Sequence, residues 1–249
     1  VRSHHLLLYG PWRIAVSKLL IIAGQSNALT RGVTGNLPVK WQTTNQVQFY
    51  KNGEFSPYHP EKEDYWGAEV GWVIEWVANK DRHEGENVYI VKCAKGNTQL
   101  APQNKYGVLG AKGFDWWPNT PNSLFQALSN SLSGAFMAVP KGDKFTSATM
   151  LWVHGEADSR TEQASRDYVD NCRYFFAKTR MLIPVPTKIG VSVVSPRYSE
   201  VHRNRQRYLG QALNTFCIDG VRTYQDDGIH LSRNGTTCVG RDAYRTEYN

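Results

Sequence analysis

Residues 19–27 read Leu-Leu-Ile-Ile-Ala-Gly-Gln-Ser-Asn, an apolar run followed at once by a glycine and then a serine. The run at residues 19–23 has the length of a buried strand and is apolar throughout, as expected of a parallel strand covered on both faces. Ser26 then falls on a strand-to-helix turn, where its hydroxyl stands clear of the sheet. Taken alone, such a serine is more often a helix cap than a nucleophile.

Four more runs resemble this strand, and segments with apolar residues at helical spacing lie between the runs. The strand-like runs are residues 88–93, 149–153, 189–194 and 221–224, and the helix-like segments are residues 70–79, 124–137, 168–181, 205–216 and 237–248. This alternation predicts an α/β fold with three α/β/α layers around a doubly wound, flavodoxin-like sheet of five parallel strands. The segment 30–67 has little periodicity, which predicts a functional loop or a small hairpin.

The composition favours one compact domain. The chain has 249 residues, 41% of them hydrophobic, and we expect residues 18–249 to form the domain and residues 1–17 to be an N-terminal extension or added residues. No run of eighteen apolar residues is present, so we expect no membrane partner. No signal peptide is recognisable, although a mature chain would have lost one, and the location stays open with an extracellular one favoured.

Charge and cysteine content exclude two further classes of function. The formal net charge is +7, but the basic residues are spread along the chain, and the one dense cluster is more typical of a solvated helix face than of a nucleic-acid site. That cluster consists of Arg197, Arg203, Arg205 and Arg207. The cysteines match no metal-binding spacing, and we expect neither a metal site nor disulfides. They are Cys93, Cys172, Cys217 and Cys238.

Candidate functional residues follow the predicted strands. In doubly wound sheets, ligands bind beyond the carboxyl ends of the strands, so these residues are expected to meet. A serine needs a base to take its proton, histidine is the usual base, and a carboxylate orients the ring. A glycine lets a backbone N–H approach a substrate oxyanion. The residues in question are Ser26 after the first strand, Gly96 after the second, His154 after the third, and Asp227 and His230 after the last.

Four sequence blocks, in this order, resemble those of SGNH hydrolases. Residues 21–27, IIAGQSN, are similar to the Gly-Gln-Ser-Asn version of the first block, found in sialate O-acetylesterases and the sixth family of carbohydrate esterases. Residues 92–98 resemble the second block, residues 151–158 resemble a Trp-x-Gln-Gly-Glu-x-Asp block, and residues 227–230 match the final Asp-x-x-His block. The resemblance extends from about Lys18 to the C-terminus.

The resemblance implies a serine esterase that removes O-acetyl groups from carbohydrates, either polysaccharides or sialic acid-type sugars, without a metal or cofactor. It implies Ser26 as nucleophile, His230 as general base and Asp227 as the carboxylate that orients the base. The backbone amides of Ser26 and Gly96 would form part of the oxyanion hole. Asp226, beside Asp227, is the rival for the carboxylate, but the spacing to His230 and the family pattern favour Asp227.

The sequence departs from the family pattern at two positions. Asn97 stands where the second block has its second glycine, so Asn97 could also contribute the amide that faces the oxyanion. His154 replaces the usual glutamine, and its ring N–H is expected to substitute as an oxyanion donor; the alternative is weakened activity. Glu156 and Asp158 are expected to support the loops by hydrogen bonds to backbone amides or to Arg160.

Substrate contacts are assigned to residues beside the nucleophile and to aromatic side chains. We place Gln25, Asn27, Trp116 and Trp117 at the cleft, because aromatic faces suit the C–H surfaces of sugars, although tryptophans are more often packed inside. Two other functions stay open. One is a broad short-chain acyl esterase or thioesterase of the same fold, distinguished by its acyl-length preference. The other is a catalytically weak glycan-binding module, distinguished by an unreactive Ser26.

Overall fold

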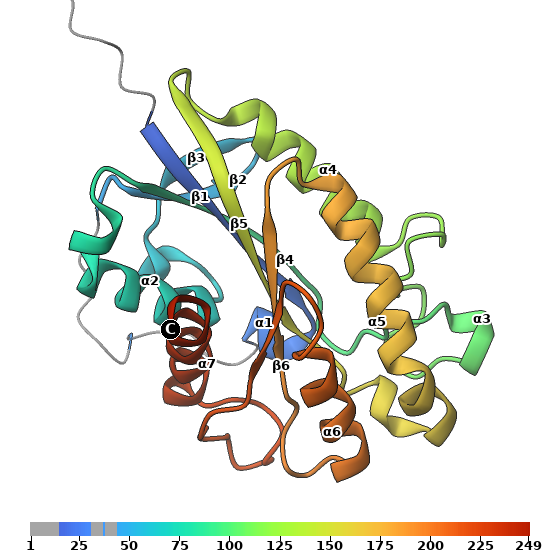
Figure 1. Ribbon diagram of the computed structural model, residues 1–249. Helices are drawn as coiled ribbons and strands as arrows, with labels where there is room; N and C mark the ends of the chain where they lie inside the picture. Colours follow the sequence, from blue (N-terminus) through green and yellow to red (C-terminus); the bar gives the residue numbers. More distant parts are fainter. Residues whose placement is uncertain (1–14, 31–36, 38–43) are drawn as a thin grey trace, which may run out of the picture.

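The computed structural model describes residues 15–30, 37 and 44–249, and within them the chain forms three layers, with helices on both faces of one sheet (Figure 1). The strands are β1 (Ala15–Gly24), β2 (Val47–Lys51), β3 (Glu54–Pro57), β4 (Asn87–Ala94), β5 (Asp143–Val153), β6 (Thr187–Ser192) and β7 (Thr215–Ile218). The α-helices are α1 (Ser26–Leu29), α2 (Ala68–Ala78), α3 (Gln103–Tyr106), α4 (Leu124–Ala138), α5 (Glu162–Leu182), α6 (Glu200–Leu209) and α7 (Arg233–Tyr248). Short 3-10 helices are η1 (Pro60–Lys62), η2 (Lys80–His83) and η3 (Asp158–Arg160).

The topology is the predicted doubly wound one, with an addition at one edge. In the described residues the strand order is β3-β2-β4-β1-β5-β6-β7, and the five strands from β4 to β7 are all parallel. The sheet has seven strands instead of five because β2 pairs with β4 in parallel and β3 returns antiparallel to β2. This hairpin confirms one of the two expectations for the segment 30–67, whose residues 31–36 and 38–43 lie outside the described residues.

The hairpin turns at Asn52 and Gly53, with φ values of 54° and 90°. Two successive positive φ values are typical of the tight turns that match strand twist, and Asn-Gly is the sequence best suited to them. The turn therefore explains why two strands form in a segment without obvious periodicity.

The core has two halves, one on each face of the sheet. Leu20 and Ile22 of β1 pack with α2 and α7 on one face, and Leu19 and Ile21 pack with α4 and α5 on the other. All four side chains are completely buried. Burying each such aliphatic side chain stabilises the fold by about 1.5–3 kcal/mol, so the central strand is firmly fixed in the sheet.

The predicted last strand, at residues 221–224, is wrong. The strand is β7, at Thr215–Ile218, and residues 221–224 contain only an isolated bridge between Tyr224 and Leu231. The predicted helix 205–216 is correspondingly shifted, because α6 ends at Leu209 before Gly210. Phe216 and Ile218 of β7 are buried in the core, whereas the apolar Val221 is 94% exposed. Asp227 and His230 therefore lie in a longer loop between β7 and α7 than the sequence suggested.

The start of the described chain belongs to the sheet. β1 begins at Ala15 and pairs with β5 from Asp143 onwards, so residues 15–17 of the expected extension lie in the strand, and residues 1–14 lie outside the described residues. None of the helices in the described ranges is long and apolar enough to span a membrane. All four cysteines fall in the described ranges, and each is a free thiol.

Candidate active site

Ser26 is placed by the sharp turn that connects β1 to α1. Gly24, the last residue of β1, has a φ of 141°, and a Cβ there would lie 2.1 Å from the carbonyl oxygen of Val153. Only glycine fits this position without displacing β5, because the backbones of the two strands are in close contact. The amide of Gln25 donates to the same carbonyl at 3.0 Å, which fixes the turn that presents Ser26.

Ser26, His230 and Asp227 form a continuous chain of hydrogen-bonded side chains. The Oγ of Ser26 lies 3.2 Å from Nε2 of His230, and Nδ1 of His230 lies 2.6 Å from Oδ2 of Asp227. The distances suit a proton transfer from the serine hydroxyl to the imidazole, with the carboxylate fixing the ring. The structure thus brings together the three residues for which the sequence predicted this relation.

The carboxylate of Asp227 is held as the charged form. Its Oδ1 accepts hydrogen bonds from the backbone amides of Ile229 and His230, at 2.8 and 2.9 Å. The side-chain hydrogen bond to His230, followed by these amides, lowers the pKa of Asp227 to about 2. The partner of the imidazole is therefore an ionised Asp227 over the whole neutral range, and the neighbouring Asp226 does not take this position.

Gly96 lies next to the serine. A Cβ on Gly96 would be 3.8 Å from Cβ of Ser26, which is ordinary van der Waals contact. The loop is anchored by the amide of Lys95, which donates to the carbonyl of Gly24 at 3.1 Å. Asn97 has a positive φ of 55°, and its side-chain oxygen accepts from Arg160 at 2.9 Å. Gly96 therefore lies beside Ser26, whereas the side chain of Asn97 is bound to Arg160, and the choice of the backbone amide of Gly96 or Asn97 for the oxyanion hole stays a prediction.

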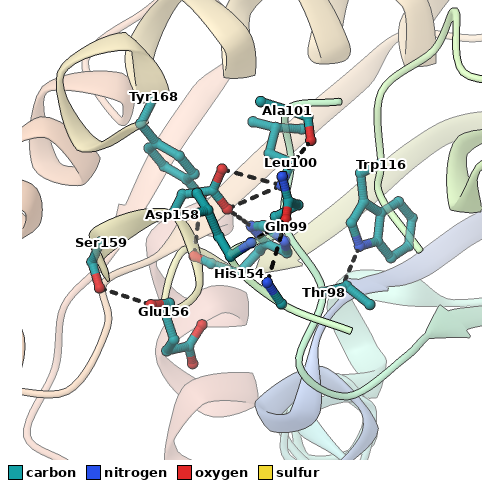
Figure 2. A network of polar contacts seen from close by, with 12 residues as sticks. Thr98, Gln99, Leu100, Ala101, Trp116, His154, Glu156, Asp158, Ser159 and Tyr168 are labelled. Atoms are coloured by element: carbon teal, nitrogen blue, oxygen red, sulfur yellow. Dashed lines mark hydrogen bonds and ion pairs between the residues drawn. The ribbon is translucent and has the colours of Figure 1, made fainter. Parts of the chain in front are cut away.

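His154 does not lie on an accessible surface. Its side chain is completely enclosed, stacks on Trp152 with ring centroids 4.5 Å apart, and lies parallel to the ring of Tyr168. Burial lowers the pKa of His154 to about 3, so the ring is neutral. Its Nδ1 lies 3.8 Å from Oδ2 of Asp158 in the same buried network (Figure 2). Both ring nitrogens are buried, so neither is exposed to donate to a substrate oxygen, and this placement does not suit the expected donor role.

The two buried carboxyl groups after β5 hold neighbouring loops, as expected. Asp158 accepts from the backbone amide of Leu100 at 3.2 and 3.0 Å, and its burial raises the pKa to about 7 (Figure 2). Glu156 accepts from the side-chain amide of Asn27 at 2.7 Å. Arg160 is bound by neither carboxylate; it contacts Asn97 and the carbonyl of Leu109 instead.

The residues expected at the substrate cleft have different placements. Trp116 is completely buried, and its Nε1 donates to Thr98 at 3.0 Å, which supports the loop that carries Gly96 (Figure 2). Trp117 is partly exposed, stacks on Tyr174 at 4.9 Å, and lines a surface hollow of about 580 Å³. Gln25 is 3% exposed, and the hollow at Trp117 is not lined by Ser26, Asp227 or His230, so a sugar contact by Trp117 stays a prediction.

Two residues of the site, Asn27 and Ser195, make contacts around His230 that the sequence did not predict. The side chain of Asn27 bonds to the backbone on both sides of His230, and Ser195 Oγ donates to the carbonyl of Gly228 at 2.5 Å. Gly228 is the turn residue between Asp227 and His230, with a φ of 66°. Neither contact has a signal in local spacing, because the partners are far apart along the chain.

The fold and the site together define an α/β/α protein with a hydrogen-bonded Ser–His–Asp arrangement at the carboxyl edge of its sheet. A family model described as carbohydrate esterase, sialic acid-specific acetylesterase, matches residues 16–247. The chain therefore belongs to this family of carbohydrate esterases, which confirms the resemblance found in its sequence blocks. No curated protein sequence matches the chain.

Solved structures with the same fold have low sequence identity to this chain. A protein from Arabidopsis thaliana has a TM-score of 0.70 at 16% identity, over 92% of this chain and 96% of its own. NanS has a TM-score of 0.56 at 15% identity, over 87% and 80% of the two chains. A novel carbohydrate acetylesterase from Xanthomonas citri has a TM-score of 0.51 at 12% identity, over 93% of this chain and 56% of that one. At these identities the likeness establishes the fold.

Proposed function

We propose that this carbohydrate esterase is a serine O-acetylesterase that acts on acetylated carbohydrates through an acyl-enzyme. The observation that carries the proposal is the chain of contacts from Ser26 through His230 to Asp227, at 3.2 and 2.6 Å, at the carboxyl edge of the sheet. Membership in the carbohydrate esterase family supports the substrate class. The description of the family favours an O-acetylated sialic acid, and an O-acetylated polysaccharide such as xylan is the other substrate to be compared.

In the acylation step, Oγ of Ser26 attacks the carbonyl carbon of the acetyl ester and its proton passes to Nε2 of His230. The negative charge that develops on the carbonyl oxygen is stabilised by the backbone amides of Ser26 and Gly96. The bond from the carbonyl carbon to the sugar oxygen then breaks, and His230 returns the proton to that oxygen. The products are a free sugar hydroxyl and an acetyl group on Ser26.

In the deacylation step, water attacks the acetyl-serine and its proton passes to His230. The bond between the carbonyl carbon and Oγ breaks, the proton returns to Oγ, and acetate leaves. Asp227 stays ionised throughout, because its contacts hold its pKa near 2, and it stabilises the imidazolium that forms in each step. The cycle needs no group beyond the side chains and amides described above.

The test is acetate release from an activated acetyl ester, acetylated xylan and O-acetylated sialic acid, with the wild type beside Ser26→Ala. Butyryl and octanoyl esters of the same alcohol report the acyl-length preference. Activity on acetylated sugars that is lost in Ser26→Ala supports the proposal. Equal rates on the longer acyl chains would instead indicate a broad acyl esterase, and an inactive wild type would indicate a glycan-binding module.

A further inference from the structure

The side chain of Asn27 joins the serine turn to the histidine loop. Its Oδ1 accepts from the backbone amide of Leu231 at 2.9 Å, and its Nδ2 donates to the carbonyl of Ile229 at 3.2 Å. These two backbone groups are on either side of His230, and Asn27 directly follows Ser26 in the chain. One carboxamide therefore holds the backbone before and after the proposed base from a position next to the proposed nucleophile.

The third contact of this carboxamide fixes its orientation. Nδ2 also donates to Oε1 of Glu156 at 2.7 Å, in a region where Asn27 is 5% exposed and Glu156 4%. With the amide reversed, its oxygen would face the acceptors Glu156 and Ile229 and its nitrogen would face the donor amide of Leu231. All three contacts would then be lost, so Glu156 selects the orientation in which Asn27 holds the loop.

We infer that Asn27 is a positioning residue that sets the distance between Ser26 and His230, and that Glu156 acts through it. This role replaces the substrate contact expected from the sequence, because both N–H groups of the carboxamide are already used inside the protein. The inference rests on the proposed function, since the distance matters only if a proton moves between the two side chains. Displacing reacting groups by about 1 Å typically costs roughly a hundredfold in rate.

The first experiment compares Asn27→Ala with the wild type in hydrolysis of an activated acetyl ester. We expect kcat to fall about a hundredfold and KM to stay within about threefold, because the substrate contacts are unchanged while the proton transfer is impaired. The rate of phosphonylation of Ser26 by a serine-directed phosphonate should fall in parallel. Asn171→Ala is the matched control, because Asn171 of α5 is equally buried, at 4% exposed.

The phosphonate also separates a positioning role from loss of folded protein. Its final stoichiometry counts the molecules with a reactive serine, whereas its rate reports the activation of that serine. Full stoichiometry with a slow rate supports the inference. Reduced stoichiometry at an unchanged rate would overturn it, because Asn27 would then act only on folding. A wild type that neither hydrolyses the ester nor reacts with the phosphonate would contradict the proposed function itself.

The second experiment tests the partnership with Glu156. Asn27→Asp keeps an acceptor for the amide of Leu231 but places a second carboxylate against Glu156, and we expect a loss at least as large as in Asn27→Ala. Adding Glu156→Gln supplies a side-chain N–H that can donate to the carboxylate introduced at position 27, which restores a hydrogen bond between the two positions. The double variant should regain about tenfold in kcat over Asn27→Asp. No recovery would overturn the assignment of Glu156 as the partner of Asn27.

Discussion

Replacing Asp227 by asparagine changes which ring nitrogen of His230 carries the proton, with little change in the geometry of the loop. Oδ1 of Asp227 accepts from two backbone amides, and an asparagine oxygen can keep both contacts. The asparagine NH₂ group then takes the place of Oδ2, 2.6 Å from Nδ1 of His230. An NH₂ group donates, so Nδ1 must become the acceptor and the ring proton moves to Nε2. In that tautomer Nε2 has no lone pair for the proton of Ser26.

The expected loss follows from this wrong tautomer. Removing the carboxylate of a serine–histidine pair while preserving geometry lowers kcat by about four orders of magnitude in a well-studied case. We expect a loss of roughly 10³- to 10⁴-fold here, which corresponds to about 4–5.5 kcal/mol of transition-state stabilisation. The melting temperature should change little, because the loop keeps its two backbone contacts.

The assay is kcat for hydrolysis of an activated acetyl ester at neutral pH, with Asp226→Asn as the control. Asp226 is exposed and does not contact the imidazole, so its variant should keep activity within about threefold of the wild type. An Asp227→Asn variant that keeps a tenth of the activity or more, or an inactive Asp226→Asn variant, would refute the role assigned to Asp227.

Three other substitutions test the description of the interior. His154→Gln should keep activity within about threefold of the wild type, because the buried ring does not face the substrate. The pKa of His154 is lowered from about 6.5 to about 3, so between these values the unfolded chain binds a proton at this position and the folded protein does not. The melting temperature of the wild type should therefore fall relative to that of the variant as pH falls from 7 to 5. Asp158→Asn tests the opposite dependence of stability on pH. The pKa of Asp158 is raised to about 7, so the folded protein keeps a proton that the unfolded chain releases. The melting temperature of the wild type should therefore fall relative to that of the variant as pH rises from 5 to 7.5. Lys18→Met removes the partner, at 2.6 Å, of the buried Glu247 and should lower the free energy of unfolding by about 3 kcal/mol in urea denaturation, and an unchanged midpoint would refute the importance of this pair.

The strand cores and the strand-end motifs were predictable because their signals are local. The apolar run at residues 19–23 is buried on both faces, and that requirement is visible in the sequence as an absence of polar residues. Ser26, Gly96 and His230 each lie beyond a strand, where the switch-point rule places reactive groups. The block at residues 151–158 meets them as well, because Glu156 accepts from Asn27 at 2.7 Å, so all four blocks converge in space.

One strand was misplaced, and the hairpin in the segment 30–67 was expected only as one of two alternatives, because the sequence signals of both elements are weak. β7 is only four residues long, and its first two residues, Thr215 and Phe216, were assigned to the end of the predicted helix 205–216, so the strand was placed too late, at residues 221–224. The β2–β3 hairpin lies at the edge of the sheet, where one side of a strand faces solvent and the apolar pattern is weak. In both cases tertiary packing determines where the strand forms, and local propensity does not.

The role of Asn27 depends on contacts between distant segments, whereas the surroundings of His154 come from nearby residues whose packing the sequence does not display. Asn27 and Leu231 are separated by 204 residues, and nothing in either segment alone indicates their hydrogen bond. His154 stands in a block where the family has an amide, so a donor role was the natural hypothesis, but the aromatic rings of Trp152 and Tyr168 enclose it. A hydrogen bond such as that from Leu231 to Asn27 can be identified only in the assembled fold.

The central claim is that Ser26 is the nucleophile, and covalent labelling tests it most directly. The wild type and Ser26→Ala are incubated with a serine-directed phosphonate that mimics an acetyl ester. The adduct is located by mass spectrometry of the intact protein and of its peptides. We expect one adduct per molecule, on Ser26, with loss of esterase activity in step with labelling. An active enzyme without an adduct on Ser26, or with equal labelling of Ser26→Ala, would contradict it.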